Sequence, residues 1–313
     1  MAAAAATRRT ARPKREETFF YGGQAVIEGV LMRGPRHWAC AARRKDGSIV
    51  MIEEPLRSRL YTSRVWKLPF LRGIAGLLEM LHLGTRAITW SANIQAEAEG
   101  IVLSKRAMRI SMALSAVVAL GLFIALPLVS AGLFHHGDRG IGFGVVEGVA
   151  RAVILLVYLS AIALAPPINR LFEYHGAEHK TINCYESGAT VSVENVRRQS
   201  RLHPRCGTGF IVVVAFVGFV VFVPLSALPV PLLIASRLVL IPAIAAISYE
   251  GIRLLTRIRT TVPGRVLLVP ILATQRLTTR EPDDSQIEVA IAALAAARSG
   301  EADTPQTPLP LAS

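Results

Sequence analysis

The amino-acid sequence predicts a mainly α-helical, polytopic membrane protein with about four transmembrane helices, an interfacial amphipathic helix and a small N-terminal cytoplasmic β unit. Three observations lead to this fold class. Of the 313 residues, 52% are apolar and only 18% are charged, a balance shifted to the apolar side of ordinary globular domains. Four apolar runs are long enough to cross about 30 Å of hydrocarbon. These runs separate the basic clusters behind the formal net charge of +13, as expected where loops face anionic lipid.

The N-terminal part divides into a tail and a β unit. Residues 1–18 are basic and rich in small residues, and no apolar core with a cleavage site follows them as in a signal peptide, so we expect a disordered cytoplasmic tail. Residues 19–68 are expected to form the β unit, because GGQAVIEGVLMRGP, WACAARR and SIVMIEE are strand-like segments. A turn containing Asp46 and Gly47 joins the last two, and an Asp-Gly turn between apolar-rich runs predicts a β-hairpin.

Residues 69–100 are expected to form an amphipathic helix. Its polar residues Arg72, Glu79, Arg86 and Asn93 recur every seven positions and give one narrow polar face. Such a helix fits either the membrane interface or a fifth position in the bundle with its polar stripe turned inward. We favour the interface, because a spanning helix should not carry so many charges.

The transmembrane domain is expected to cover residues 101–258. Basic residues precede its first apolar run, fill the loop at residues 169–208 between the second and third, and follow the fourth, so they lie on one face of the membrane. This bias predicts that both termini and the loop are cytoplasmic. The four runs are residues 110–134, 145–168, 208–225 and 231–254.

Arg237 is a charged residue inside the fourth apolar run. Two accounts are open for it: its side chain reaches the outer headgroups, or it pairs with a buried partner such as Glu147. We favour the first, because Arg237 lies within two turns of the expected outer boundary.

Residues 259–298 are expected to form a cytoplasmic C-terminal segment and helix. An amphipathic or loop-like connector covers residues 260–279, and a helix begins near Asp283 and runs to about Arg298, with charges that suit the helix dipole. Residues 299–313 are rich in Pro, Ala and Thr and are expected to form a second disordered tail.

Composition and missing motifs exclude several function classes. Three cysteines give no disulfide framework. The sequence contains no Walker A loop, dinucleotide fingerprint, serine nucleophile elbow or basic patch studded with aromatic residues, which argues against nucleotide hydrolysis and nucleic-acid binding. Membrane lipids are the expected partners, and a homo-oligomer is left open by the small-xxx-small spacing of Gly144 and Gly148.

The loop at residues 169–208 contains three of the seven histidines and two of the three cysteines. Its segment His175-Gly-Ala-Glu178-His179 has the form H-x-x-E-H. On a helix, His175 and His179 share a face and can bind one divalent ion, most suitably zinc, while Glu178 is placed as a general base. A third ligand is needed, and His203 or Cys206 from the far end of the loop can supply it.

Further residues are open to more than one interpretation. Glu186 follows His179 by seven positions and is another candidate ligand. Glu28 is flanked by glycines and either points into the site or is a β-edge carboxylate without a role. The histidines can also be polar residues near lipid headgroups, and Cys184 and Cys206 can be small core residues.

Four motifs follow one another along the chain: YGGQAVIEGVLMRGP, EYHGAEHKTINCYE, SRLHPRCGTGF and QRLTTREPDDSQIEVAIAAL. Together they resemble the YqhQ-like family of bacterial membrane proteins over nearly all of residues 19–296. That family carries the label of a predicted metal-dependent enzyme, so the resemblance implies a bacterial cytoplasmic membrane protein with a metal site. The positions that match the family motifs are His175, Glu178, His179, Cys184, His203 and Cys206.

Two functions are compatible with these residues. The leading hypothesis is a metal-dependent membrane enzyme, a hydrolase that meets its substrate at the inner leaflet. Its metal ligands are His175, His179 and either His203 or Cys206, and Glu178 is its base. The alternative is a non-enzymatic membrane scaffold or assembly factor in which four protein ligands close a structural metal site. A transporter ranks last, because the apolar runs offer almost no polar residues at the membrane midplane.

Overall fold

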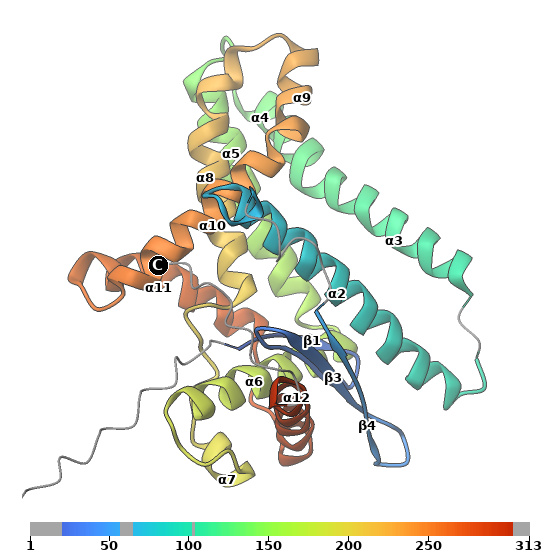
Figure 1. Cartoon of the computed structure of the whole chain (residues 1–313). Coiled ribbons are helices and arrows are strands. Elements are labelled where there is room, and N and C mark those ends of the chain that lie inside the picture. The colour runs from blue at the N-terminus through green and yellow to red at the C-terminus, as the bar shows by residue number, and fades with distance from the viewer. Residues whose placement is uncertain (1–20, 57–64, 102–103, 303–313) are drawn as a thin grey trace, which may run out of the picture.

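The computed structural model describes residues 21–56, 65–101 and 104–302. Figure 1 shows apolar helices at one end of the molecule and a four-stranded sheet, packed against helices, at the other. The expectation of a mainly helical chain with a small N-terminal sheet is confirmed. The expected tail at residues 1–18 lies outside the described residues, and so do residues 303–313 of the second tail, whose residues 299–302 are helical.

The β unit is an antiparallel meander. Its strands are β1 (Gly22–Val26), β2 (Gly29–Arg33), β3 (His37–Arg43) and β4 (Ile49–Pro55), paired in the order β1-β2-β3-β4. The hairpin predicted from Asp46 and Gly47 joins β3 to β4, with Arg43 opposite Ile49. Gly47 has a φ of +87°, which glycine adopts without steric cost.

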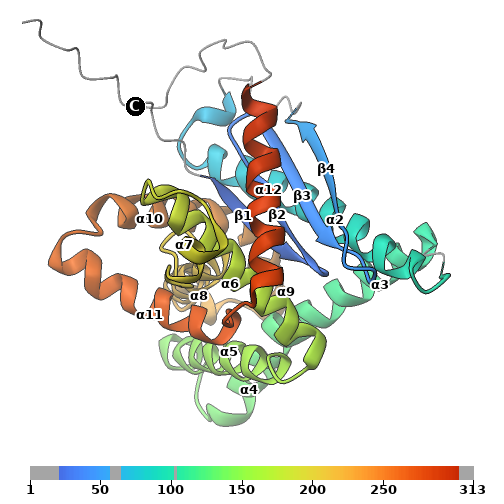
Figure 2. The same ribbon diagram turned by 90° about the horizontal axis from the view of Figure 1, so that it is seen from below.

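Helices cover both faces of the sheet. Alternate side chains of β2 and β3 point to opposite faces. One set packs against α12 (Asp284–Ala302) and the other against α2 (Leu71–Glu97), which lie on opposite sides of the strands in Figure 2. Val30, Met32, Ala39 and Ala41 belong to the first set. Leu31, Trp38 and Cys40 belong to the second, which Val26 of β1 joins. The buried face of the sheet beside α12 also supports the candidate site, because residues of α6 (Pro166–Glu186) join the same core.

The polar stripe of α2 is occupied by ion pairs. Arg72 pairs with Glu250 at 2.5 Å, Arg33 with Glu79 at 3.3 Å, and Arg86 with Glu54 at 2.6 Å. These pairs tie α2 to α10 (Ile241–Ile258), to β2 and to β4. The helix predicted at residues 69–100 is thus present, and it connects the sheet to α10. Its placement at a membrane interface stays a prediction.

Two described helices are long and apolar enough to cross a membrane. The first, Arg106–Phe134, combines most of α3 (Lys105–Leu120) with the π-helical segment η2 (Gly121–Ala125) and α4 (Leu126–Phe134). The second is α5, Ile141–Ile162. A third span is present if α9 (Val230–Val239) and α10, which are bent by 46° to one another, are counted together.

By length and composition, the described residues thus contain fewer candidate spans than the four expected, and prolines explain the difference. The third predicted run forms α8 (Gly207–Phe222), whose 16 residues reach about 24 Å, before Pro224 begins the 3-10 segment η3 (Pro224–Ala227). The fourth run breaks at Leu240, because Pro242 in the first turn of α10 cannot continue the preceding helix.

Arg237 is fully buried, so the expectation that it reaches the outer headgroups is wrong. Its guanidinium donates to both carboxylate oxygens of Glu147, at 2.9 and 2.5 Å, and the two side chains are 0% and 1% exposed. Glu147 also accepts a hydrogen bond from Arg151. The pair joins α9 to α5 inside the apolar helices.

The loop predicted at residues 169–208 is largely helical. It contains most of α6 and the short α7 (Val193–Arg197), and the connector predicted at residues 260–279 is the helix α11 (Val262–Thr278). The short 3-10 segment η1 (Val65–Lys67) precedes α2. The C-terminal helix begins as predicted, since Asp283 caps α12 by accepting a hydrogen bond from the Gln286 N–H at 2.9 Å.

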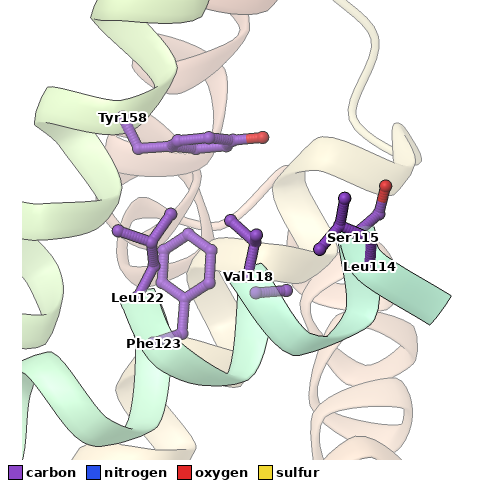
Figure 3. Close-up of a pocket in the computed structure, with 7 residues that line it drawn as sticks. Leu114, Ser115, Val118, Leu122, Phe123 and Tyr158 are labelled. Atoms are coloured by element: carbon purple, nitrogen blue, oxygen red, sulfur yellow. The ribbon is translucent and has the colours of Figure 1, made fainter. Parts of the chain in front are cut away.

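A cavity of about 290 Å³ lies between α3 and α5. Figure 3 shows Tyr158 of α5 on one side of it and Phe123 and Val118 on the other. Its lining consists of Leu114, Ser115, Val118, Ala119, Leu122, Phe123 and Tyr158. None of these residues belongs to the histidine and cysteine cluster described next, so this cavity is separate from that chemistry.

Candidate metal centre

His175, His179 and Cys206 come together to form one group of ligand atoms. The two histidines lie one turn apart on α6, and Cys206 is the N-cap residue of α8. One nitrogen of each histidine and the sulfur of Cys206 all lie within 4.8 Å of one another. Two imidazoles and one thiol are the donor types that zinc prefers in proteins.

Backbone carbonyls fix both imidazole rings. Nδ1 of His175 lies 2.8 Å from the Thr278 carbonyl oxygen, and Nδ1 of His179 lies 2.6 Å from the Arg201 carbonyl oxygen. A carbonyl oxygen only accepts, so each Nδ1 carries the proton, and in the neutral ring Nε2 keeps a free lone pair. Histidines that bind metals are oriented in this way by their second nitrogen.

The Nε2 atoms face the sulfur. Nε2 of His175 lies 3.2 Å from Sγ of Cys206. Nε2 of His179 is buried and has no hydrogen-bond partner among the described residues. A buried nitrogen lone pair without a partner is costly, and a bound cation would satisfy it, so the residues present fit a metal ion.

The protonation states suit metal binding. Burial lowers the pKa of His179, which keeps its imidazole neutral near pH 7. Burial by itself would raise the pKa of Cys206, but the positive charge that His179 carries when it is protonated, together with the hydroxyl and N–H of Thr208, outweighs it, so the net shift is downward. A depressed pKa favours the thiolate, which is the form that binds metals.

Glu178 is buried beside the group. Its pKa is raised to about 8, chiefly by burial, and the charge of His175 opposes that shift. Oε2 of Glu178 has no hydrogen-bond partner among the described residues. The carboxyl stem packs against Gly23 of β1, where any Cβ would lie 2.8 Å from Cδ of Glu178. The carboxyl group is thus buried, with one oxygen that accepts no hydrogen bond from the described residues.

His203 is adjacent to the group but does not belong to it. Its ring lies 5.7 Å from that of His179, centre to centre, and its Nε2 lies 3.6 Å from Oε2 of Glu186. Glu186 in turn accepts a hydrogen bond from Arg205. Of the two third ligands proposed from the sequence, the geometry favours Cys206, while His203 and Glu186 pair with each other.

Cys184 and Glu28 lie away from the group. Cys184 is buried in the core beside α12, with Sγ 3.6 Å from the Thr190 carbonyl oxygen. Glu28, in the β1–β2 turn, accepts hydrogen bonds from Arg170 and from the Tyr174 hydroxyl, the latter at 3.2 Å. These contacts indicate that Cys184 packs in the core and that Glu28 forms an ion pair with Arg170.

Gln275 of α11 is a site residue that sequence reasoning missed. Its side-chain amide forms two hydrogen bonds with the backbone of His203, accepting from N–H and donating to C=O, each at 2.8 Å. This clamp holds the segment that carries Cys206. The sequence feature that could have indicated Gln275 is a glutamine within an apolar helix. The roles of the Thr278 and Arg201 carbonyls could not be predicted in this way, because every residue has a backbone carbonyl.

Comparisons with known proteins agree on one family. Residues 68–299 match the family described as "Protein of unknown function (DUF1385)". The chain is 38% identical over 289 residues to "Uncharacterized protein YqhQ" of Bacillus subtilis (strain 168), covering 87% of this chain and 90% of that one. No solved structure matches the chain.

Proposed function

The chain belongs to the DUF1385 family of proteins of unknown function, and we propose that it is a zinc-dependent hydrolase of the bacterial cytoplasmic membrane, acting at the inner leaflet. The observation that best supports metal binding is that Nε2 of His179 is buried beside Cys206 and has no hydrogen-bond partner in the part of the chain that the structure describes. Its ring is fixed so that this nitrogen cannot turn away to another partner.

Each residue of the centre then has a role. His175, His179 and Cys206 hold the ion, with Thr278 and Arg201 orienting the rings through their carbonyls. A divalent ion bound there supplies a Lewis acid that activates water near neutral pH. Glu178 would act as the base in its ionised form, taking the proton of the attacking water at Oε2 and returning it to the leaving group. Because burial raises its pKa to about 8, this form gains population as the pH rises toward that value.

The membrane location rests on the apolar helices and on the basic residues at one side of them. Two or three helices are compatible with spanning a membrane. The group of His175, His179 and Cys206 lies beside the N-terminal end of α8, where an apolar helix begins. With an even number of spans and both termini cytoplasmic, as the distribution of Lys and Arg predicts, this end of α8 would lie at the inner leaflet. Membrane lipids, lipid-linked intermediates and membrane-associated peptides would all be met there.

A structural metal site in a membrane scaffold is the second candidate, and the burial of the group favours it. His179 is only 1% exposed and Cys206 only 7%, and the described cavity between α3 and α5 lies elsewhere. An ion at this position would join α6 to α8, with α11 supporting one ring. A closed site would need a fourth protein ligand, for which His203 is the nearest histidine.

Zinc content of the detergent-purified full chain tests the proposal. We expect about one equivalent per chain in the wild type and less than a tenth of that in His175→Ala and Cys206→Ala. His203→Ala is the matched control and should keep its zinc. A wild type without metal after reconstitution with Zn²⁺ would overturn the proposal, and loss of zinc in His203→Ala as well would favour the closed site of a scaffold.

Glu178→Gln separates the two candidates further. The enzyme requires that this variant keeps its zinc but no longer releases product from bacterial lipid extracts or membrane peptides in proteoliposomes, as judged by mass spectrometry. Product release that continues unchanged in Glu178→Gln would exclude Glu178 as the base.

A further inference from the structure

The helix α11 has two apolar stripes on opposite sides. The inner stripe, at Gly264, Leu268 and Ile271, is buried, and it packs against Leu255 of α10 and Val212 of α8. The outer stripe consists of Val262, Val266, Val269 and Ala273, which recur at helical spacing and are all exposed. The three valines of the outer stripe are 74%, 63% and 63% exposed. Nothing among the described residues covers this stripe.

Exposed arginines flank the outer stripe in the sequence. The sequence from residue 251 to residue 280 contains six arginines and no aspartate or glutamate. Four of them are exposed and form no ion pair with any carboxylate of the described residues. These four are Arg257, Arg259, Arg265 and Arg276. An exposed apolar stripe in a segment whose charged residues are all arginines is complementary to an anionic lipid surface.

The direction of α11 agrees with this complementarity. Figure 1 shows α11 running out to the side of the apolar helices rather than along them. Its 17 residues include Arg265, Arg276 and two prolines, so α11 is not among the helices that could cross a membrane. This composition suits a helix that lies in the membrane interface, with its apolar face among the headgroups and acyl chains.

We propose that the outer stripe and the four arginines form a seat for anionic phospholipid at the inner leaflet. Val262, Val266 and Val269 enter the boundary between headgroups and acyl chains, and the arginines bind lipid phosphates. The proposal shares with the proposed function only the membrane location. It also fixes the depth of the candidate metal centre relative to the membrane, because the last turn of α11 carries the Thr278 carbonyl that orients His175.

The first test is the depth of a nitroxide label at Val266→Cys in nanodiscs of phosphatidylglycerol and phosphatidylcholine, with labelled Thr190→Cys as the aqueous reference. The unlabelled wild-type cysteines are buried. We expect the Val266 label to be more accessible to oxygen than to a water-soluble nickel complex, and the reference label to show the opposite order. A water-exposed label at Val266, or spin–spin broadening from a second copy, would overturn the proposal.

The second test is lipid selectivity of the full chain. We expect the wild type to retain phosphatidylglycerol over phosphatidylcholine at least fivefold, and the variant with Arg257, Arg259, Arg265 and Arg276 changed to Gln to retain less than twofold. Arg44→Gln/Arg198→Gln is the matched control, because these exposed arginines lie far from α11 in the sequence. Unchanged selectivity in the fourfold variant would exclude the seat. Zinc content, measured on the same samples, reports on the metal centre independently.

Discussion

Gly22 and Gly23 are neighbours on β1, but only Gly23 is closely packed against other residues. A Cβ at Gly23 would lie 2.7 Å from the Leu31 carbonyl oxygen and 2.8 Å from Cδ of Glu178, whereas a Cβ at Gly22 would meet nothing within 4 Å. The Leu31 carbonyl belongs to the sheet and cannot give way. We expect Gly23→Ala to lower the free energy of unfolding by about 1–3 kcal/mol and Gly22→Ala to change it by less than about 0.5 kcal/mol. Denaturant unfolding in detergent measures both, and equal effects would contradict the close packing of Glu178 on β1.

Cys40 and Cys206 are expected to differ in reactivity, because their pKa values are shifted in opposite directions. Burial raises the pKa of Cys40 to about 12, whereas contacts with His179 and Thr208 lower the pKa of Cys206. In metal-stripped protein at pH 8 we expect iodoacetamide to modify Cys206 at least tenfold faster than Cys40, and added Zn²⁺ to abolish that difference. Peptide mass spectrometry measures the rates. Modification of Cys206 that zinc does not slow would show that its sulfur is not a ligand.

At the scale of elements, the buried pair of Arg237 and Glu147 determines how α9 meets α5. Removing one partner of a fully buried pair leaves an uncompensated charge, which costs about 3–5 kcal/mol. We expect Arg237→Leu to lower the thermal midpoint in detergent strongly, and Glu147→Leu/Arg237→Leu to be less destabilised than the sum of the single variants. Strictly additive single effects would mean that the two side chains do not interact. Glu147 keeps Arg151 as a neighbour, which limits the loss in the first variant.

The clamp formed by Gln275 links α11 to the segment that carries Cys206. Its amide occupies both the N–H and the C=O of His203, and the side chain is fully buried. We expect Gln275→Leu to weaken zinc binding by about 10–100-fold, as loss of an orienting contact does in other metal sites. Thr274→Ala, one position earlier, is the control, because the Thr274 hydroxyl bonds only within its own helix. Competition with a fluorescent chelator gives the affinities, and equal values in both variants would contradict the clamp.

At the scale of the whole molecule, the sequence predicted what local patterns encode. The spacing of His175 and His179 on one helix, the Asp-Gly hairpin and the start of α12 at Asp283 each depend on residues within a few positions of one another, and each is present. The grouping of Cys206 with the two histidines is long-range and was only one of two options, because spacing cannot show which residue of the returning segment turns inward.

Most of the missed features depend on contacts between distant segments, and one depends on local breaks in the backbone. The number of spanning helices was overestimated, because hydropathy does not register the breaks at Pro224 and Pro242. The burial of Arg237 depends on Glu147, 90 residues away. Gln275 and the carbonyls that orient the histidines belong to segments brought together only by the packing of α8 against α11, which no local pattern records.

An ion at the centre would connect helices that the chain otherwise joins only through packing and hydrogen bonds, so metal removal should be visible in global stability. A ligand that binds only the folded state stabilises it by RT ln(1 + [L]/Kd), about 2.7 kcal/mol when free zinc is 100 times Kd. We therefore expect a chelator to lower the thermal midpoint of the wild type by several degrees and to leave that of His175→Ala unchanged, because this variant lacks one ligand. Circular dichroism at 222 nm during heating measures both midpoints. Restoring Zn²⁺ should recover the wild-type midpoint alone, and an equal fall in both proteins would place the effect of the chelator outside this centre.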